Sequence, residues 1–400
     1  MKRRPLSLLS LGHLTVDVTS GALPAVLPFL QKEFGLSYLL LAIVATTFQI
    51  TSSVTQPIFG AISDRGAQRF LIPLGVLLAA GGFAAIGVAP TYPLMLAAIA
   101  LSGAGSAIFH PEATKSARFV AGEHRATGMS YFTIGGNIGV ALGPLVLTGI
   151  VAWRGLGGLW IYLIPGAIMA AVVAATGPSI ARAETAHFAR RPRNAAHAQP
   201  KAMAMLVAVV ATRSIVYGGI LTFVPLFEVN VLHHSAAANG PLLFAILGAG
   251  ALATIIGAAA ADRAGFRRTM IVCSAFVPPL LAVFLISPGP LGVICLVLVG
   301  AFVVATTTVT VIMAQEYMPH RIALASAMVI GFTSGIAGLT VTALGQLADA
   351  AGLWAVLWTL VGVSVAGTAL TFALPERTHA AQPKDASAAP GNLARSAAHD

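Results

Sequence analysis

Three ionisable side chains lie within long apolar stretches of this sequence, where each is costly unless it has a use. Asp17 lies near the middle of the stretch 6–30, and His13 precedes it by four residues, so a helix would place both on one face. Arg213 lies near the middle of another stretch, 203–229. A carboxylate removed from water holds a proton more readily than it does in solution. The pattern predicts that Asp17 exchanges protons with help from His13, and that Arg213 approaches Asp17 across a cavity, holding it ionised or binding an anionic substrate.

A second group with possible chemistry lies near the end of the apolar stretch 93–117. His110, Pro111 and Glu112 are consecutive, and residues two apart on a helix differ by roughly 200° in direction. His110 and Glu112 should therefore not share a face unless Pro111 distorts the helix. We expect one of them to face the inner cavity and the other to reach the basic loops, with Lys115 within one turn of Glu112. Their place in the cytoplasmic third of the span predicts a cytoplasmic gate or proton exit.

The composition shows which elements must carry these residues. The chain has 400 residues, of which 57% are hydrophobic and only 9% are charged, whereas soluble domains have roughly 25% charged residues. A polytopic helical membrane protein, with its apolar surface in lipid, explains these values. The net charge of +10 does not indicate a nucleic-acid partner, because the basic residues lie between apolar stretches. Cys273 and Cys295 lie within apolar stretches, so no disulfide framework is predicted.

Windows of roughly 20 mostly apolar residues, the length that crosses a bilayer, predict twelve transmembrane helices. Two polar regions separate and follow them: 178–202, a cytoplasmic linker, and 376–400, a disordered cytoplasmic tail. We therefore predict an all-α membrane protein with a six-helix bundle over 1–177 and a second over 203–375. The predicted spans are 6–30, 37–61, 70–89, 93–117, 127–151, 156–177, 203–229, 240–261, 269–287, 291–315, 321–346 and 353–374.

The distribution of Lys and Arg predicts the orientation of these spans. Almost all of the 23 basic residues fall in segments on one side, while the opposite side holds only Lys32 and Arg154. Because basic loops stay in the cytoplasm, both termini are predicted to be inside.

The two halves repeat each other with an offset of roughly 200 residues, as expected for parallel bundles related by an axis along the membrane normal. Such transporters bind their substrate between the bundles near the membrane midplane. Matching cytoplasmic loops in the two halves carry acid and base side chains whose ion pairs would clamp a gate. These residues are Asp64, Arg65 and Arg69 in the first half, and Asp262, Arg263, Arg267 and Arg268 in the second.

The fifth predicted span carries small residues on one face. Gly139 and Gly143 are four residues apart, which permits close contact between helix backbones, and Pro144 follows with a missing backbone donor. Further polar residues of the spans are weaker candidates for the wall of the central cavity. They are Gln49, Tyr131 and Asn137.

Several of these motifs resemble those of a known family. The loops 60–65 and 262–268 resemble the loop signature of the major facilitator superfamily, and 139–144 resembles its antiporter signature. The stretch 103–112, with its His-Pro-Glu element, and the stretch 135–139 are similar to the fosmidomycin resistance protein family. This resemblance implies a proton-driven exporter of a small, phosphonate-like antibiotic.

We therefore predict a proton-coupled antiporter that exports a small drug-like or anionic compound and functions as a monomer in a bacterial cytoplasmic membrane. Two alternatives remain open: an uptake permease or symporter for an organic anion, and a polytopic membrane enzyme. No phosphate-binding loop of the P-loop type is present, so ATP drive is not expected. The sequence predicts a non-enzymatic protein with no cofactor, no metal site and no nucleic-acid partner.

Overall fold

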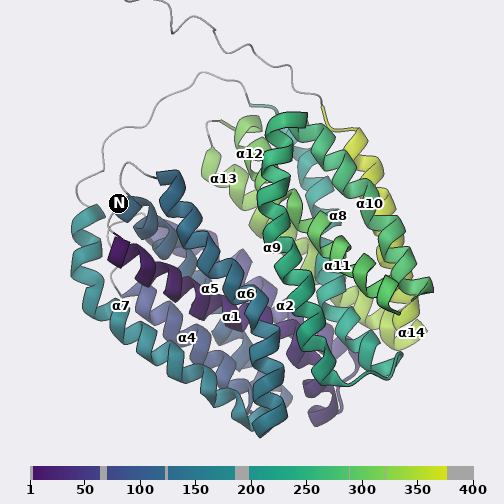
Figure 1. The fold of residues 1–400 in the computed structure, drawn as a ribbon, viewed down its shortest axis with the longest axis horizontal. Coiled ribbons are helices and arrows are strands. Elements are labelled where there is room, and N and C mark those ends of the chain that lie inside the picture. Colours follow the sequence, from purple (N-terminus) through teal and green to yellow (C-terminus); the bar gives the residue numbers. More distant parts are fainter. Residues whose placement is uncertain are drawn as a thin grey trace, which may run out of the picture.

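The computed structural model describes residues 3–63, 70–121, 125–184, 198–287, 289–319 and 321–375, and within these ranges the chain is helical, without strands. The helices form two bundles that lean together (Figure 1). The first bundle contains α1 (Arg3–Phe34), α2 (Tyr38–Gln49), η1 (Ile50–Val54), α3 (Gln56–Ser63), α4 (Leu71–Ile86), α5 (Tyr92–Ala121), α6 (Arg125–Arg154), η2 (Leu156–Tyr162) and α7 (Leu163–Glu184). The second contains α8 (Pro200–Asn230), η3 (Ala236–Ala238), α9 (Asn239–Ala264), α10 (Phe266–Ile286), α11 (Pro290–Ala305), α12 (Thr307–Tyr317), α13 (Ile322–Ala327), η4 (Met328–Phe332) and α14 (Thr333–Phe372).

These helices make twelve passes in the described part of the chain. Ten helical stretches are long and apolar enough to cross a membrane, and α4 is a shorter apolar helix. The longest stretch, Leu324–Phe372, holds two passes, because Gly352 adopts φ 83°, a left-handed conformation that breaks the helix. The predicted fold of twelve transmembrane helices in two six-helix bundles is confirmed.

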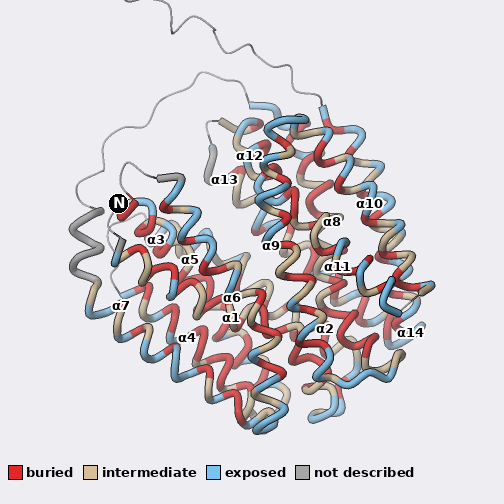
Figure 2. Tube along the Cα trace, viewed as in Figure 1, coloured by how far each residue is buried: buried red, intermediate tan, exposed pale blue. Residues whose placement is uncertain are grey.

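The burial pattern is that of helices surrounded by lipid. Buried residues gather inside each bundle, and exposed residues follow its outer faces (Figure 2). On α9, for example, Leu252, Ile255 and Ile256 are each about two-thirds exposed. Large apolar side chains repeated on one outward helix face are stable in contact with hydrocarbon rather than water.

Glycines bring α1 and α6 into close contact within the first bundle. A Cβ atom on Gly139 would overlap the main chain at Leu14, and one on Gly143 would overlap the main chain near Ala22. Pro144 lies inside α6, which continues as one helix from Arg125 to Arg154. The predicted small-residue face is therefore a packing surface that holds α6 against α1.

The two bundles are joined near the ends that the Lys and Arg pattern assigns to the outer side. The main-chain amides of Tyr38 and Leu39, at the start of α2, donate to the Asp349 carboxylate of α14 at 2.7 and 3.0 Å. Asn230 Nδ2 donates to Gln31 Oε1 at 2.7 Å. The start of α1 lies at the left of Figure 1, and the end of α14 lies at its upper right.

The boundaries of the two predicted domains stay predictions. The helix α7 extends to Glu184, beyond the predicted end at residue 177, and α8 begins at Pro200. Residues 185–197, which form most of the predicted linker, and the predicted tail 376–400 lie outside the described residues.

Candidate functional site

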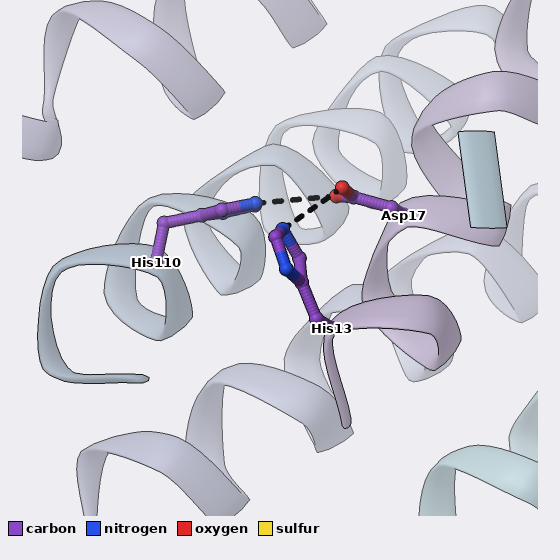
Figure 3. A group of neighbouring side chains, drawn as sticks. All are labelled: His13, Asp17 and His110. Atoms are coloured by element: carbon purple, nitrogen blue, oxygen red, sulfur yellow. Dashed lines mark ion pairs between the residues drawn. The ribbon is translucent and has the colours of Figure 1, made fainter. Parts of the chain in front are cut away.

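Asp17 is the centre of a three-residue cluster formed by two helices of the first bundle (Figure 3). His13 Nε2 lies 3.2 Å from Asp17 Oδ2, and His110 Nε2 lies 3.2 Å from Asp17 Oδ1. His13 and Asp17 belong to successive turns of α1, whereas His110 comes from α5. His13 and Asp17 are each only 8% exposed. Two imidazole rings from different helices thus point at one buried carboxylate.

The remaining nitrogen of each ring is held by a main-chain carbonyl oxygen. His13 Nδ1 lies 3.0 Å from the oxygen of Phe132, and His110 Nδ1 lies 2.7 Å from that of Ser106. Because a carbonyl oxygen can only accept, each Nδ1 carries a hydrogen. The two contacts between Nε2 and the Asp17 oxygens then each need a proton of their own, on the ring or on the carboxyl group. The cluster is therefore a place where protons can be taken up and released.

Phe132 and Gly136 of α6, together with His110 of the cluster itself, fix the position of the His13 ring. The Phe132 ring of α6 stacks on it with a centroid distance of 4.3 Å, and the His110 ring meets it edge-on at 5.1 Å. Gly136, one turn after Phe132, lies directly against it, and a Cβ atom there would overlap the His13 ring and crowd Asp17. Gly136 is therefore part of the site, although the sequence analysis gave it no role. In the sequence, Gly136 follows Phe132 by four residues, or about one helical turn, and this spacing could have indicated that both contact the same ring.

Asp17 and His110 line a cavity of about 400 Å³ between the two bundles. This volume suits a small organic molecule, and its position at the bundle interface is where transporters built from repeats bind their substrates. Polar groups from both bundles line the rest of its wall. They are Ser20, Thr46, Gln49, Ser52, Ser53, Gln56 and Ser106 from the first bundle, and Ser214, Tyr217, Thr222 and Ser334 from the second.

Among the predicted cavity residues, Gln49 lines this cavity, and its Nε2 donates to Ser53 Oγ at 3.1 Å. Tyr131 and Asn137 do not line it, and the Tyr131 side chain is half exposed. Ser52 and Ser53 also line this cavity. Both belong to η1, a π-helical segment, which is a feature that occurs often at functional sites.

The structure does not support the prediction that His110 belongs to a cytoplasmic gate, because it places this residue at the central carboxylate. The helix α5 runs through Pro111 without a break, from Tyr92 to Ala121. His110 faces the cavity, and Glu112, which is 2% exposed, pairs with Lys115 at 2.9 Å. His110 therefore faces the cavity and Glu112 lies within one turn of Lys115, while the predicted contact of Glu112 with the basic loops stays a prediction. The gate role of Glu112 stays a prediction.

The prediction that Arg213 approaches Asp17 across one cavity is also wrong for this structure. Arg213 lines a separate, smaller cavity inside the second bundle, and its Nη1 donates to Thr306 Oγ1 at 2.8 Å. Asp17 pairs instead with His13 and His110. Arg213 lies near the middle of α8, as Asp17 lies near the middle of α1. Its side chain, however, lies on the helix face that lines the smaller cavity, and not on the face that was predicted to meet Asp17.

The predicted gate loops are described only in the second half. Asp64, Arg65 and Arg69 lie outside the described residues. In the second half Gly265 turns the chain with φ 88° between α9 and α10.

Within the described residues Asp262 forms no ion pair, so the predicted clamp between Asp262 and the basic residues Arg263, Arg267 and Arg268 is not observed. Instead, Arg267 donates to the carbonyl oxygens of Leu374 and Phe372 at 2.7 Å each, which ties the loop to the end of α14. Arg267 therefore anchors the main chain at the end of α14.

The cluster of His13, Asp17 and His110 also has the ligand types that could hold a metal ion, with one ligand atom from each residue lying within 4.8 Å of the others. No metal site was predicted, because residue spacing alone does not bring His110 to α1. The same Nε2 atoms can instead hold the protons that join the rings to Asp17.

Comparisons with known proteins agree with this architecture. The family model described as Major Facilitator Superfamily matches residues 9–326. An uncharacterised transporter of this type from Bacillus subtilis, YfnC, is 29% identical over 389 residues, which cover 92% of each chain. The Fosmidomycin resistance protein of Escherichia coli K12 is 28% identical over 381 residues, 94% of this chain and 93% of the relative. This similarity confirms the resemblance predicted from the His-Pro-Glu and glycine motifs.

A solved structure supports the fold alone, because the sequence identity is low. The crystal structure of a mutant of the nucleoside transporter NupG matches with a TM-score of 0.76 at 15% identity, covering 92% of this chain and 99% of that one. Two six-helix bundles around a central cavity, together with a family match over most of the chain, lead to one conclusion: this multi-pass membrane protein belongs to the Major Facilitator Superfamily.

Proposed function

We propose that this protein is a secondary active transporter of a bacterial cytoplasmic membrane, which exports a small drug-like or anionic compound in exchange for protons. The observation that carries this proposal is the buried Asp17 carboxylate, held between His13 and His110 at the wall of a cavity between the bundles. The similarity to a protein named for fosmidomycin resistance supports a phosphonate as the first compound to test.

The chemistry of the cluster suggests how protons and substrate exclude each other. Without its two protons, the cluster offers the Asp17 carboxylate and both Nε2 atoms as acceptors for the hydrogen-bond donors of a substrate. When protons occupy these positions the acceptors are lost, so proton binding releases the substrate. Proton binding and substrate binding are thus coupled through one small site, and the coupling needs no contact with Arg213.

Alternating access requires the bundles to separate on one side and close on the other. The Asp349 contacts with Tyr38 and Leu39 and the contact between Asn230 and Gln31 join the bundles at one end. We propose that these contacts break when the cavity opens to the outside. The contacts of Arg267 with the end of α14 lie at the opposite, cytoplasmic end of the second bundle.

The test is transport by the purified full-length protein in liposomes under an imposed pH gradient, with fosmidomycin as the probe. Export-type exchange predicts that fosmidomycin moves against the proton flux and that Asp17→Asn abolishes this coupling while the protein still inserts. Glu33→Gln is the matched control, because Glu33 is an exposed carboxylate at the outer end of the same helix α1. Unchanged coupling in Asp17→Asn would rule out the proposed proton site.

The direction of movement separates the proposal from its alternative. An uptake symporter for an organic anion would move the probe together with protons, in the same direction. Consumption of the probe rather than its relocation, measured by recovery of the intact compound, would favour the membrane enzyme instead.

A further inference from the structure

We propose that the second bundle binds a small monovalent anion, the size of chloride, beside Arg213. The site is a cavity of about 30 Å³ lined by groups of α8, α10, the junction of α11 and α12, and α14. It has no lining residue in common with the cavity at Asp17. The proposal is therefore independent of the proposed proton-coupled transport.

The first argument is the balance of charge around Arg213. A guanidinium group stays protonated in proteins, and a charge inside a membrane bundle is costly unless it is compensated. Among the described residues, Arg213 contacts the Thr306 hydroxyl and no carboxylate.

The acidic residues described in the second half are engaged or located elsewhere. Glu228 pairs with His234, and Asp349 accepts hydrogen bonds from α2. Asp262 and Glu316 line the loop cavity at the end of α9. Compensation of the Arg213 charge must therefore come from outside these side chains.

The second argument concerns hydrogen-bond donors. Five hydroxyl groups line the small cavity, and three of them donate to main-chain carbonyl oxygens. Thr212 donates to Val209, Ser364 to Val361, and Thr368 to Ser274 and Ser364.

The other two hydroxyls, those of Ser274 and Thr306, donate to no acceptor among the described residues, and Thr306 already accepts from Arg213. The guanidinium group likewise retains donors beyond the one bonded to Thr306. Donors from three different elements thus line one cavity without acceptors. An anion is the partner that satisfies several donors at once and balances the charge.

The size of the cavity selects the class of anion. A volume of about 30 Å³ exceeds the roughly 10–15 Å³ that a cavity needs to hold one water molecule. The apolar side chains of Val277 and Phe302 line the same cavity. A halide fits this space, whereas a phosphonate group with its substituent requires more.

The test is the thermal unfolding of the purified full-length protein, measured while chloride replaces gluconate at constant ionic strength. A thiol-reactive dye reports unfolding, because Cys273 and Cys295 are free and buried in the folded state. The wild type should show a saturable rise in unfolding temperature with chloride. Arg213→Gln should lose this rise, while Arg154→Gln, which alters an exposed arginine, should keep it. A wild type that does not respond, or an Arg213→Gln protein that responds like the wild type, overturns the proposal.

Two further measurements keep the proposal testable if Arg213→Gln does not fold. Ser274→Ala should raise the half-saturating chloride concentration about tenfold, because one hydrogen bond to a charged group is lost. Bromide soaked into crystals of the wild type should give an anomalous peak beside Arg213, and a peak elsewhere only would contradict the assignment.

Methylphosphonate should not replace chloride; if it does, the site binds the anionic group of a transported compound instead. Asp17→Asn should keep the chloride response, so failure of the proton site leaves this result interpretable.

Discussion

The first helix of each bundle carries one charged residue near its middle, and the two residues have opposite surroundings. Asp17 of α1 faces the cavity between the bundles and is paired with two histidines. Arg213 of α8 faces the interior of its own bundle and contacts a single hydroxyl group. The two helices occupy comparable places in the repeated fold, but their charged residues point to different cavities. A structural repeat therefore preserves the placement of helices without preserving the chemistry of the faces that they present.

This difference suggests a division of labour between the halves. The charge of the first half lies where both bundles and a substrate can reach it, and its partners can gain or lose protons. The charge of the second half is permanent and lies away from the central cavity. We infer that coupling is a task of the first bundle, and that Arg213 serves the integrity of the second.

The largest effect is expected from replacing Asp17 with a neutral residue, while the same kind of replacement at Arg213 should leave coupling in place. Asp17→Asn should abolish proton-coupled movement of the probe in liposomes, because the amide cannot exchange a proton. Arg213→Gln should keep the dependence of transport on the pH gradient. If Arg213→Gln loses coupling as completely as Asp17→Asn, the proposed division between the halves is wrong.

Gly136→Ala should reduce transport roughly a hundredfold, the scale of effect that a displacement of about 1 Å has on a positioned group. A Cβ atom at Gly136 overlaps the His13 ring and must displace it from Asp17. The measurement is the initial rate of transport at equal protein content. Gly149→Ala, on the same helix α6, is the control, since a Cβ atom there meets nothing within 4 Å. Equal rates for both variants would show that the position of His13 does not matter.

His110→Gln should reduce proton-coupled transport about tenfold, because a hydrogen bond to a charged group contributes about 1.5 to 3 kcal/mol. The comparison is with His234→Gln, which removes a histidine paired with Glu228 at the outer end of the second bundle. Both variants are tested over a series of imposed pH gradients. A smaller loss for His110→Gln than for His234→Gln would contradict the central role of His110.

Asp349→Ala should have the smallest effect, a loss of about 1 kcal/mol in the stability of the contact between the bundles, since a carboxylate that caps a helix contributes about that much. The side chain caps α2 from the opposite bundle. A cysteine placed at Tyr38 should react faster with an aqueous thiol reagent in the Asp349→Ala background. An unchanged rate would mean that this contact does not hold the outer end closed.

Much of the architecture could be predicted because hydrophobicity and charge are read along the chain. Apolar length identified the twelve passes, and most helix ends lie within a few residues of the predicted bounds. The helix α7 differs most, because it continues into polar sequence to Glu184. The contact of Gly139 and Gly143 with α1 followed from residue size alone. The pair of His13 and Asp17 was predictable because both belong to one helix and are four residues apart.

The remaining features of the site depended on how separate helices are rotated against each other. His110 is 93 positions from Asp17, and no pattern within α5 shows that its face meets α1 rather than the cytoplasmic loops. Arg213 lies one turn before Tyr217, yet only Tyr217 lines the central cavity. A rotation of a fraction of a turn separates the two outcomes.

The sequence by itself determined that this chain crosses a membrane, how many times it does so, which ends face the same side, and which residues carry charge inside it. Each of these properties is local, because hydrocarbon excludes polar groups wherever they occur along the chain. The tertiary structure alone decided that Asp17 meets His110 instead of Arg213 and that Gly136 makes room for the pair. Those contacts arise from the packing of helices far apart in sequence, and packing depends on the shapes of all the faces at once.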